Sequence, residues 1–189
     1  MRIDVKIADD QLARFQNMAG AVGSVKARQA YARAINRVTN SVYGKVIRAT
    51  AKQTSIPTAI LRKTVRKSLA AHKGDGPLSG AVYATGKPLS LKYFGARQFK
   101  WGTRVKVWGE TRKLNSAFIF AGTYNSGKAV ANGHVWKRVG KSSLPIEKQE
   151  GPSVPEGIVA GEAEHAFRET VETMLPARVQ HELSRLLGI

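Results

Sequence analysis

Cysteine is absent from the 189-residue sequence, which excludes disulfide bonds, thiolate metal sites, cysteine nucleophiles and iron–sulfur clusters. Long apolar runs are lacking as well, and no segment approaches the ~20 apolar residues that a membrane-spanning helix requires. No basic segment followed by an apolar one, as in a secretory signal peptide, opens the chain. We therefore expect no membrane partner and a location in the cytoplasm of the cell that makes the protein.

Acidic residues are scarce, and the shortage is confined to one part of the chain. Residues 1–146 hold 27 Lys/Arg and 5 Asp/Glu, whereas residues 147–189 hold 4 and 8, so the two parts carry +22 and −4 of the total +18. A positive field of this size attracts phosphate backbones and acidic protein surfaces alike. The alternative interpretation of the positive charge is that these side chains are only solvated and bind no partner.

Recognisable catalytic patterns are also lacking. The segment 122–129 resembles a phosphate-binding loop, but Ala129 stands where Ser or Thr would hold Mg²⁺, and a strand-like pattern follows it instead of a helix. We interpret this segment as a hairpin turn. None of the four histidines pairs with another at metal-ligand spacing, and the neighbours Glu164 and His165 point in different directions on a helix. The sequence predicts no enzymatic activity and no cofactor or metal.

Apolar residues at steps of three and four predict two long helices. Ser24 caps the first, which extends to about Gln53. Residues 158–187 form the second, with a break or kink expected at Leu175 because Pro176 lies inside the pattern. Shorter helices are expected at about 9–18 and directly after Ser55-Ile56-Pro57.

Short β-type runs predict several strands. An antiparallel meander is expected over residues 117–121, 134–139 and 144–148, because His134 to Val139 alternates between polar and apolar residues. The remaining strands are expected at 1–6, 68–72, 81–84, 89–94 and 105–108, and a linker or turn at 151–157. The fold class is therefore α+β, a small twisted antiparallel sheet with a long N-terminal helix and a C-terminal helix.

A basic, aromatic, glycine-rich segment at 95–104 is interpreted as the tip of a hairpin arm near 87–110. Its interleaved aromatic residues allow nucleic-acid binding by stacking, although such residues more often belong to the core of strands. The chain divides into a basic α+β core at 1–160, which includes this arm, and a C-terminal helical segment at 161–189. We expect that segment to pack on the core or on a neighbouring subunit.

An ordered set of short patterns, none diagnostic alone, resembles the minor tail protein Z family of long-tailed bacteriophages. The patterns are Ala34-Ile-Asn-Arg-Val38, Arg62 to Arg66, Ala117-Phe-Ile119, His134 to Lys141, Leu144-Pro-Ile146, Ala166-Phe167, Leu175-Pro176 and Gln180 to Leu183. The resemblance implies a structural virion protein that completes the head-proximal end of the tail, between the tail terminator or tail tube and the head connector. It implies a neck-protein α+β fold and a ring, often sixfold, around the DNA path, and assembly in the host cytoplasm.

A ring subunit needs two different, complementary surfaces, and the uneven charge can supply them. We expect the acidic side of that contact to be Glu162, Glu164, Glu169 and Glu172. The basic side, facing partner proteins or DNA, is expected to be Arg33, Arg37, Arg48, Lys52, Arg62, Lys63, Arg66, Lys67, Arg97, Lys100, Arg104 and Lys106. A free nucleic-acid-binding protein without sequence specificity is the alternative function.

Overall fold

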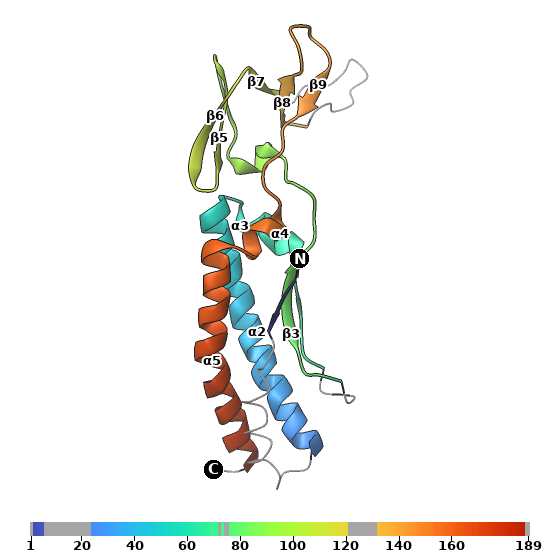
Figure 1. Ribbon diagram of the computed structural model, residues 1–189, viewed down its shortest axis with the longest axis vertical. Helices are drawn as coiled ribbons and strands as arrows, with labels where there is room; N and C mark the ends of the chain where they lie inside the picture. The colour runs from blue at the N-terminus through green and yellow to red at the C-terminus, as the bar shows by residue number, and fades with distance from the viewer. Residues whose placement is uncertain (1, 6–23, 72, 74–75, 121–131, 188–189) are drawn as a thin grey trace.

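The computed structural model describes residues 2–5, 24–71, 73, 76–120 and 132–187. The helix expected at 9–18 and the loop-like segment at 122–129 lie outside these ranges. The described chain is elongated, with long helices at one end and short strands at the other (Figure 1). We call these parts the helical lobe and the β lobe. The predicted α+β class is confirmed.

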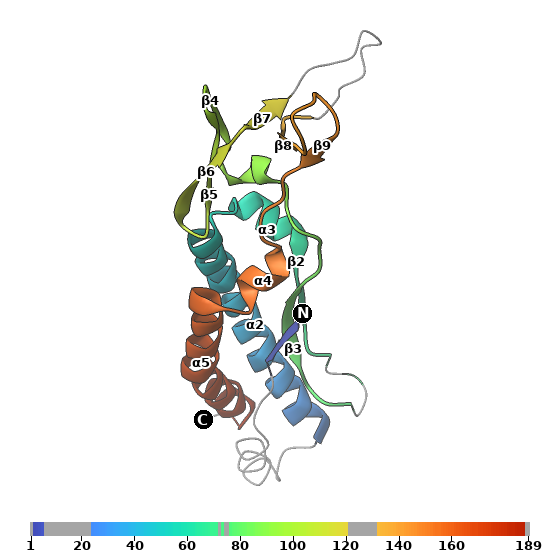
Figure 2. The same cartoon turned by 45° about the horizontal axis from the view of Figure 1, so that its top comes forward.

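Two antiparallel helices, α2 (Ser24–Thr54) and α5 (Gly161–Leu187), lie side by side along the helical lobe (Figures 1 and 2). The apolar stripe of α2 is buried, and its residues Ile35, Val38 and Val42 have no solvent exposure. The sequence predicted the ends of α2 to within one residue. None of the helices in the described ranges has the length and hydrophobicity needed to cross a membrane.

Of the break or kink expected at Leu175, the break is not present, because α5 continues through Pro176. A proline inside a helix costs about 3 kcal/mol. Leu175, Val179 and Leu183 are all buried on this helix, and burying one such side chain contributes roughly 1.5–3 kcal/mol. Packing on both sides of the proline therefore outweighs its local cost.

A three-stranded antiparallel sheet covers α2 in the order β1 (Arg2–Val5), β3 (Gly80–Ala84), β2 (Val65–Ser68). The strand expected at 68–72 is wrong over its described residues apart from Ser68. The strand β2 directly follows α3 (Thr58–Thr64) and ends at Ser68, because Val65 is buried and pairs with Ala84. β3 lies so close to α2 that a β-carbon at Gly80 would overlap the hydroxyl of Thr39.

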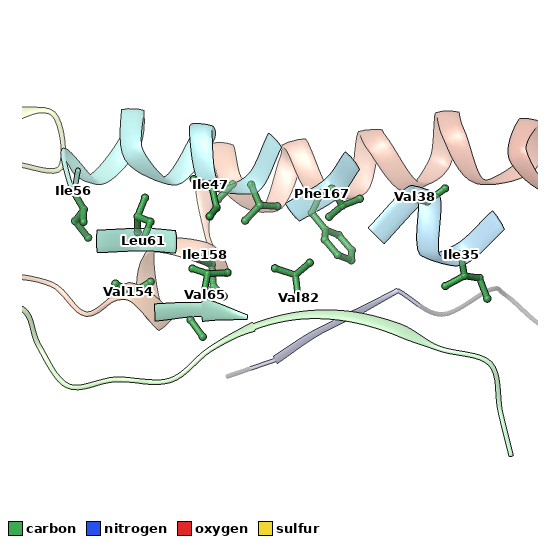
Figure 3. Close-up of a cluster of buried hydrophobic side chains, with 14 of the residues drawn as sticks. Ile35, Val38, Ile47, Ile56, Leu61, Val65, Val82, Val154, Ile158 and Phe167 are labelled. Carbon is green, nitrogen blue, oxygen red and sulfur yellow. The ribbon is translucent and has the colours of Figure 1, made fainter. Parts of the chain in front are cut away.

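The core of the helical lobe joins segments that are distant in sequence. Figure 3 shows Ile47 of α2, Leu61 of α3, Val82 of β3 and Phe167 of α5 in one cluster with Ile158. Ile158 belongs to α4 (Val154–Ile158), a short helix where the sequence predicted a linker or turn. Ser153 and Glu156 cap it reciprocally, and this S-x-x-E pattern is a helix-start signal visible in the sequence.

The β lobe is inserted between β3 and α4 and is joined by two adjacent segments, residues 89–91 and 149–152, which we call the neck. Leu89 donates a backbone hydrogen bond to Pro152 (3.3 Å) and accepts one from Gly151 (2.7 Å). Leu91 donates to Gln149 (3.3 Å). The chain thus enters and leaves the β lobe at one place.

Two further three-stranded antiparallel sheets build the β lobe. The first contains β4 (Arg97–Phe99), β5 (Gly102–Val107) and β6 (Glu110–Asn115), and the second contains β7 (Ala117–Phe120), β8 (His134–Arg138) and β9 (Ile146–Lys148). The second sheet is the predicted meander, which is confirmed. Strand β6 was not predicted, because most of its residues are polar and exposed.

The strand expected at 89–94 is wrong, since Leu91–Phe94 form a 3₁₀ turn, η1. Leu91 and Phe94 are both buried, and residues three apart point to opposite faces of a strand but to one side of a 3₁₀ turn. Gly95 ends the turn in the left-handed conformation, with φ of 63°.

Candidate partner-binding surfaces

One face of the β4–β5–β6 sheet is strongly basic. Arg97 pairs directly with Arg104, and Arg104 pairs directly with Lys113, so three cations lie in a row across the three strands. Side chains of directly paired residues share a face, and Lys106, two residues after Arg104, lies on it too. We call Arg97, Arg104, Lys106 and Lys113, together with Phe99 and Trp101, the basic sheet face.

No described carboxylate neutralises this face. Like charges directly opposite one another destabilise a sheet. The one acidic residue of these strands, Glu110, pairs with Val107, whose side chain is buried on the other face. Among the described residues, none of the four cations forms an ion pair with a carboxylate. The face therefore carries an electrostatic cost that a partner with negative charge would remove.

Two partly exposed aromatic rings hold the cations of this face. Phe99 and Trp101 stack with ring centroids 5.3 Å apart and planes 8° from parallel. The Arg104 guanidinium lies 5.0 Å from the Phe99 centroid, and Lys113 Nζ lies 5.8 Å from the Trp101 centroid. Such cation–π contacts favour a fixed position for each charge.

The hairpin of β4 and β5, which is the arm expected at 95–104, is tied to β7 by side-chain hydrogen bonds. Gln98 Oε1 accepts from the backbone N–H of Ile119 (2.8 Å), and Thr103 Oγ1 donates to the carbonyl of Ala117 (3.0 Å). Ser116 N–H donates to the carbonyl of Trp101 (3.2 Å). These bonds link the basic sheet face to the second sheet.

A second basic surface runs along α2. Arg33, Arg37, Lys45, Arg48 and Lys52 are exposed, and their spacing places them on one side of the helix. Two of them are paired at the helix–helix contact: Arg33 Nε lies 2.7 Å from Glu182 Oε2, and Lys52 Nζ lies 3.3 Å from Glu162 Oε1. The other three, which we call the α2 stripe, form no ion pair with a described carboxylate.

The remaining cations expected from the sequence lie at other places. Arg62, Lys63, Arg66 and Lys67 are exposed on α3 and β2, and Lys67 Nζ donates to Asn40 Oδ1 (2.5 Å) and lies over the ring of Tyr43. Lys100 is exposed at the turn between β4 and β5. The fold therefore distributes the twelve expected cations over three surfaces. Lys113 was not among them, and the pairing of β6 with β5 places it beside Arg104.

The four expected acidic residues all lie on α5. Glu162 pairs with Lys52 of the same chain, and Glu164 accepts from Arg168 at 2.7 Å. His165 Nδ1 lies 3.8 Å from Glu169, a contact that is ionic only when the imidazole is protonated. Glu169 and Glu172 are exposed and contact no described lysine or arginine as an ion pair. These two carboxylates are the ones open to a partner.

His134 connects β8 to the neck. Its Nδ1 lies 2.5 Å from the hydroxyl oxygen of buried Ser90, and its ring contacts Trp136 edge-on. Burial lowers the pKa of His134, and the nearby Lys92 and Lys148 lower it further, while Glu150 acts in the opposite direction. The folded protein therefore favours the neutral imidazole.

We expect the stability of the protein to fall as the pH drops through about 6.5, the ordinary pKa of histidine. Because the folded pKa is lowered, the unfolded chain binds the proton first, and stability is lost until the pH passes below the folded pKa. Urea midpoints between pH 7.5 and 5 would measure this loss. His134→Gln should reduce the difference in midpoint, and an unchanged difference would show that other groups cause it.

The described residues contain no cluster of three or more His, Asp or Glu side chains that could hold a metal ion. An open cavity of about 330 Å³ lies between β5, β6 and the neck, with Val105, Leu114 and Gln149 in its lining. The lining also includes Arg112, Glu150 and Glu156, and the described residues that form it include no serine, threonine or histidine that could act as a nucleophile beside them.

The model of one protein family, described as prophage minor tail protein Z, matches residues 22–189. The matched stretch extends from α2 to the end of α5, so it includes the α2 stripe, the basic sheet face and the acidic residues of α5. No match was found among curated proteins, and none among solved structures.

Proposed function

The chain belongs to the prophage minor tail protein Z family, and from this premise we propose that it completes the head-proximal end of the tail and joins it to the head connector. Membership makes the protein a structural component of a phage tail, and so of the virion. We propose that it acts as a ring, with six copies as the expected number, around the path of the DNA. The family match over both lobes is the observation that carries this proposal.

The helical lobe supplies a means of closing such a ring. A head-to-tail ring requires two different surfaces on each subunit. The pairs Arg33–Glu182 and Lys52–Glu162 set the antiparallel register of α2 and α5. In that register the open carboxylates of α5 lie at the same height along the lobe as the α2 stripe.

We propose that Glu169 and Glu172 of one subunit meet the α2 stripe of the next. Two copies related by rotation alone, without a shift along the lobe, would bring these surfaces to the same level. Because the charges are exposed, their complementarity would mainly set register and encounter rate, and would weaken with salt. Partners at the two ends of the ring would be tail terminator or tail tube proteins on one side and connector proteins on the other.

Electron microscopy of particles made with and without this protein tests the proposal. Without the protein, we expect tails with unfinished head-proximal ends that do not join heads, and the intact gene in trans should restore them. Glu169→Gln/Glu172→Gln should restore them poorly, whereas the matched control Glu150→Gln/Glu164→Gln, which removes two carboxylates already paired with cations of their own chain outside the contact of α2 with α5, should restore them well. Unchanged tail ends that still join heads in the absence of the protein would contradict the proposed role.

The alternative, a free nucleic-acid-binding protein, is favoured by one observation, the unneutralised basic sheet face. A free binder that used its whole basic surface would show a very steep dependence of DNA affinity on salt. A ring subunit that touches DNA through one face would show a shallow dependence.

A further inference from the structure

We propose that the basic sheet face binds the phosphate backbone of duplex DNA. The place of the contact, on the inner side of the ring, rests on the function proposed above. The binding itself is a property of the single chain and is tested on it.

The first argument is the cost that the face carries. Arg97, Arg104 and Lys113 are direct neighbours across three strands, where opposite charges would have stabilised the sheet and like charges destabilise it. The inner side of the same sheet is packed normally, with Val105 and Val107 buried. The sheet could therefore form without this row of three cations. An anionic partner would replace the repulsion among the three side chains with attraction to itself.

The second argument concerns the chemistry of the partner. Two of the three cations in the row are arginines, whose planar fork matches a phosphate with two parallel hydrogen bonds. Adjacent strands lie ~4.8 Å apart, so the row spans roughly 10 Å. Duplex DNA presents one negative charge per ~1.7 Å of its axis, which is dense enough to meet every cation of such a row.

A second copy of this chain is a poorer partner for this face. In its β lobe the exposed carboxylates without a described ion pair, Glu110 and Glu147, stand singly among many lysines and arginines. Three of the five carboxylates on α5 already pair with cations of their own chain, namely Glu162, Glu164 and Glu182. The two open ones, Glu169 and Glu172, lie on the helical lobe, at the level of the α2 stripe rather than of the β lobe.

The third argument is that the face is built before a partner arrives. The stacked rings of Phe99 and Trp101 hold Arg104 and Lys113 in place. Gln98 and Thr103 fix the hairpin on β7. Side chains that are already ordered lose less entropy on binding, which favours affinity for a rigid, regularly charged partner.

The test uses the full-length chain and a fluorescently labelled 20-base-pair duplex, with affinity measured by anisotropy at several NaCl concentrations. Four phosphate contacts predict a slope of log affinity against log salt of about −3.6. The variant Arg97→Gln/Arg104→Gln/Lys113→Gln should reduce the magnitude of that slope by about 2.7. The matched control Arg62→Gln/Lys63→Gln/Arg66→Gln removes the same charge from the helical lobe and should leave the slope unchanged.

Three results would overturn the proposal: no binding at 50 mM NaCl, equal losses in the two triple variants, or tighter binding to polyglutamate than to the duplex. The last would identify the face as a site for an acidic protein. Thermal unfolding checks that the variants fold, and removing like charges should not lower the midpoint. The DNA titration tests the basic sheet face, and the micrographs of tail ends test the proposed ring. Each proposal can therefore be contradicted without the other.

Discussion

Alanine at Gly102 is expected to disrupt the β4–β5–β6 sheet while the helical lobe stays folded. Gly102 has a φ of +149°, a conformation that residues with a side chain rarely adopt. A β-carbon there would overlap the carbonyl oxygen of Leu114 and lie 3.1 Å from Asn115 Cα. Both obstacles are backbone of the neighbouring strand, so relief requires separating β5 from β6.

We expect Gly102→Ala to cost about 3 kcal/mol or more, because strained backbone and steric overlap add. Urea unfolding followed by tryptophan fluorescence should show the loss, and backbone amides of the sheet should exchange with solvent faster. Gly44→Ala is the control, because a β-carbon there meets nothing within 4 Å and alanine in a helix gains up to about 1 kcal/mol. A Gly102→Ala protein within 1 kcal/mol of the parent would show that the sheet adjusts.

Phe94→Ala is expected to have a comparable effect at the neck. Phe94 is 1% exposed and anchors η1. The second segment of the neck, residues 149–152, packs on its ring so closely that a β-carbon at Gly151 would lie 2.8 Å from Phe94 Cε2. Removing a buried phenyl ring leaves a cavity and costs about 3–5 kcal/mol.

The neighbouring residue provides the matched control for this variant. Tyr93 is 38% exposed and contacts the ammonium of Lys92 through its ring. Tyr93→Ala should therefore cost less than about 1 kcal/mol. Equal urea midpoints for the two alanine variants would mean that the ring of Phe94 does not secure the neck.

Local patterns predicted the elements that bury one regular face. The helix beginning at Ser24 and the meander of 117–148 were recognised because their apolar residues repeat at the helical or strand period over enough residues. Features decided by tertiary packing were not predicted. The second long helix was expected, but its continuity through Pro176 depends on packing against α2, and the η1 turn depends on the burial of Leu91 and Phe94.

For the candidate surfaces too, the sequence predicted local properties of residues but not the contacts between distant segments. Composition indicated which residues are cationic, and eleven of the twelve expected cations are indeed exposed, with Arg104 half-buried under its contact with Phe99. Strand register, which places Lys113 beside Arg104, is a property of pairing between segments and not of either segment alone. Likewise, the pairing of Glu162 with Lys52 joins residues that are far apart in the sequence.

The geometry of the neck affects how the sequence of this protein can change during evolution. Leu89 and Gly151 are hydrogen-bonded to each other, so the whole β lobe is a cassette whose two ends meet. Joining those ends by a short turn would cost little loop-closure entropy and would leave every contact between α2 and α5 in place. A phage could therefore exchange this cassette, with its basic sheet face, while keeping the packed pair of α2 and α5.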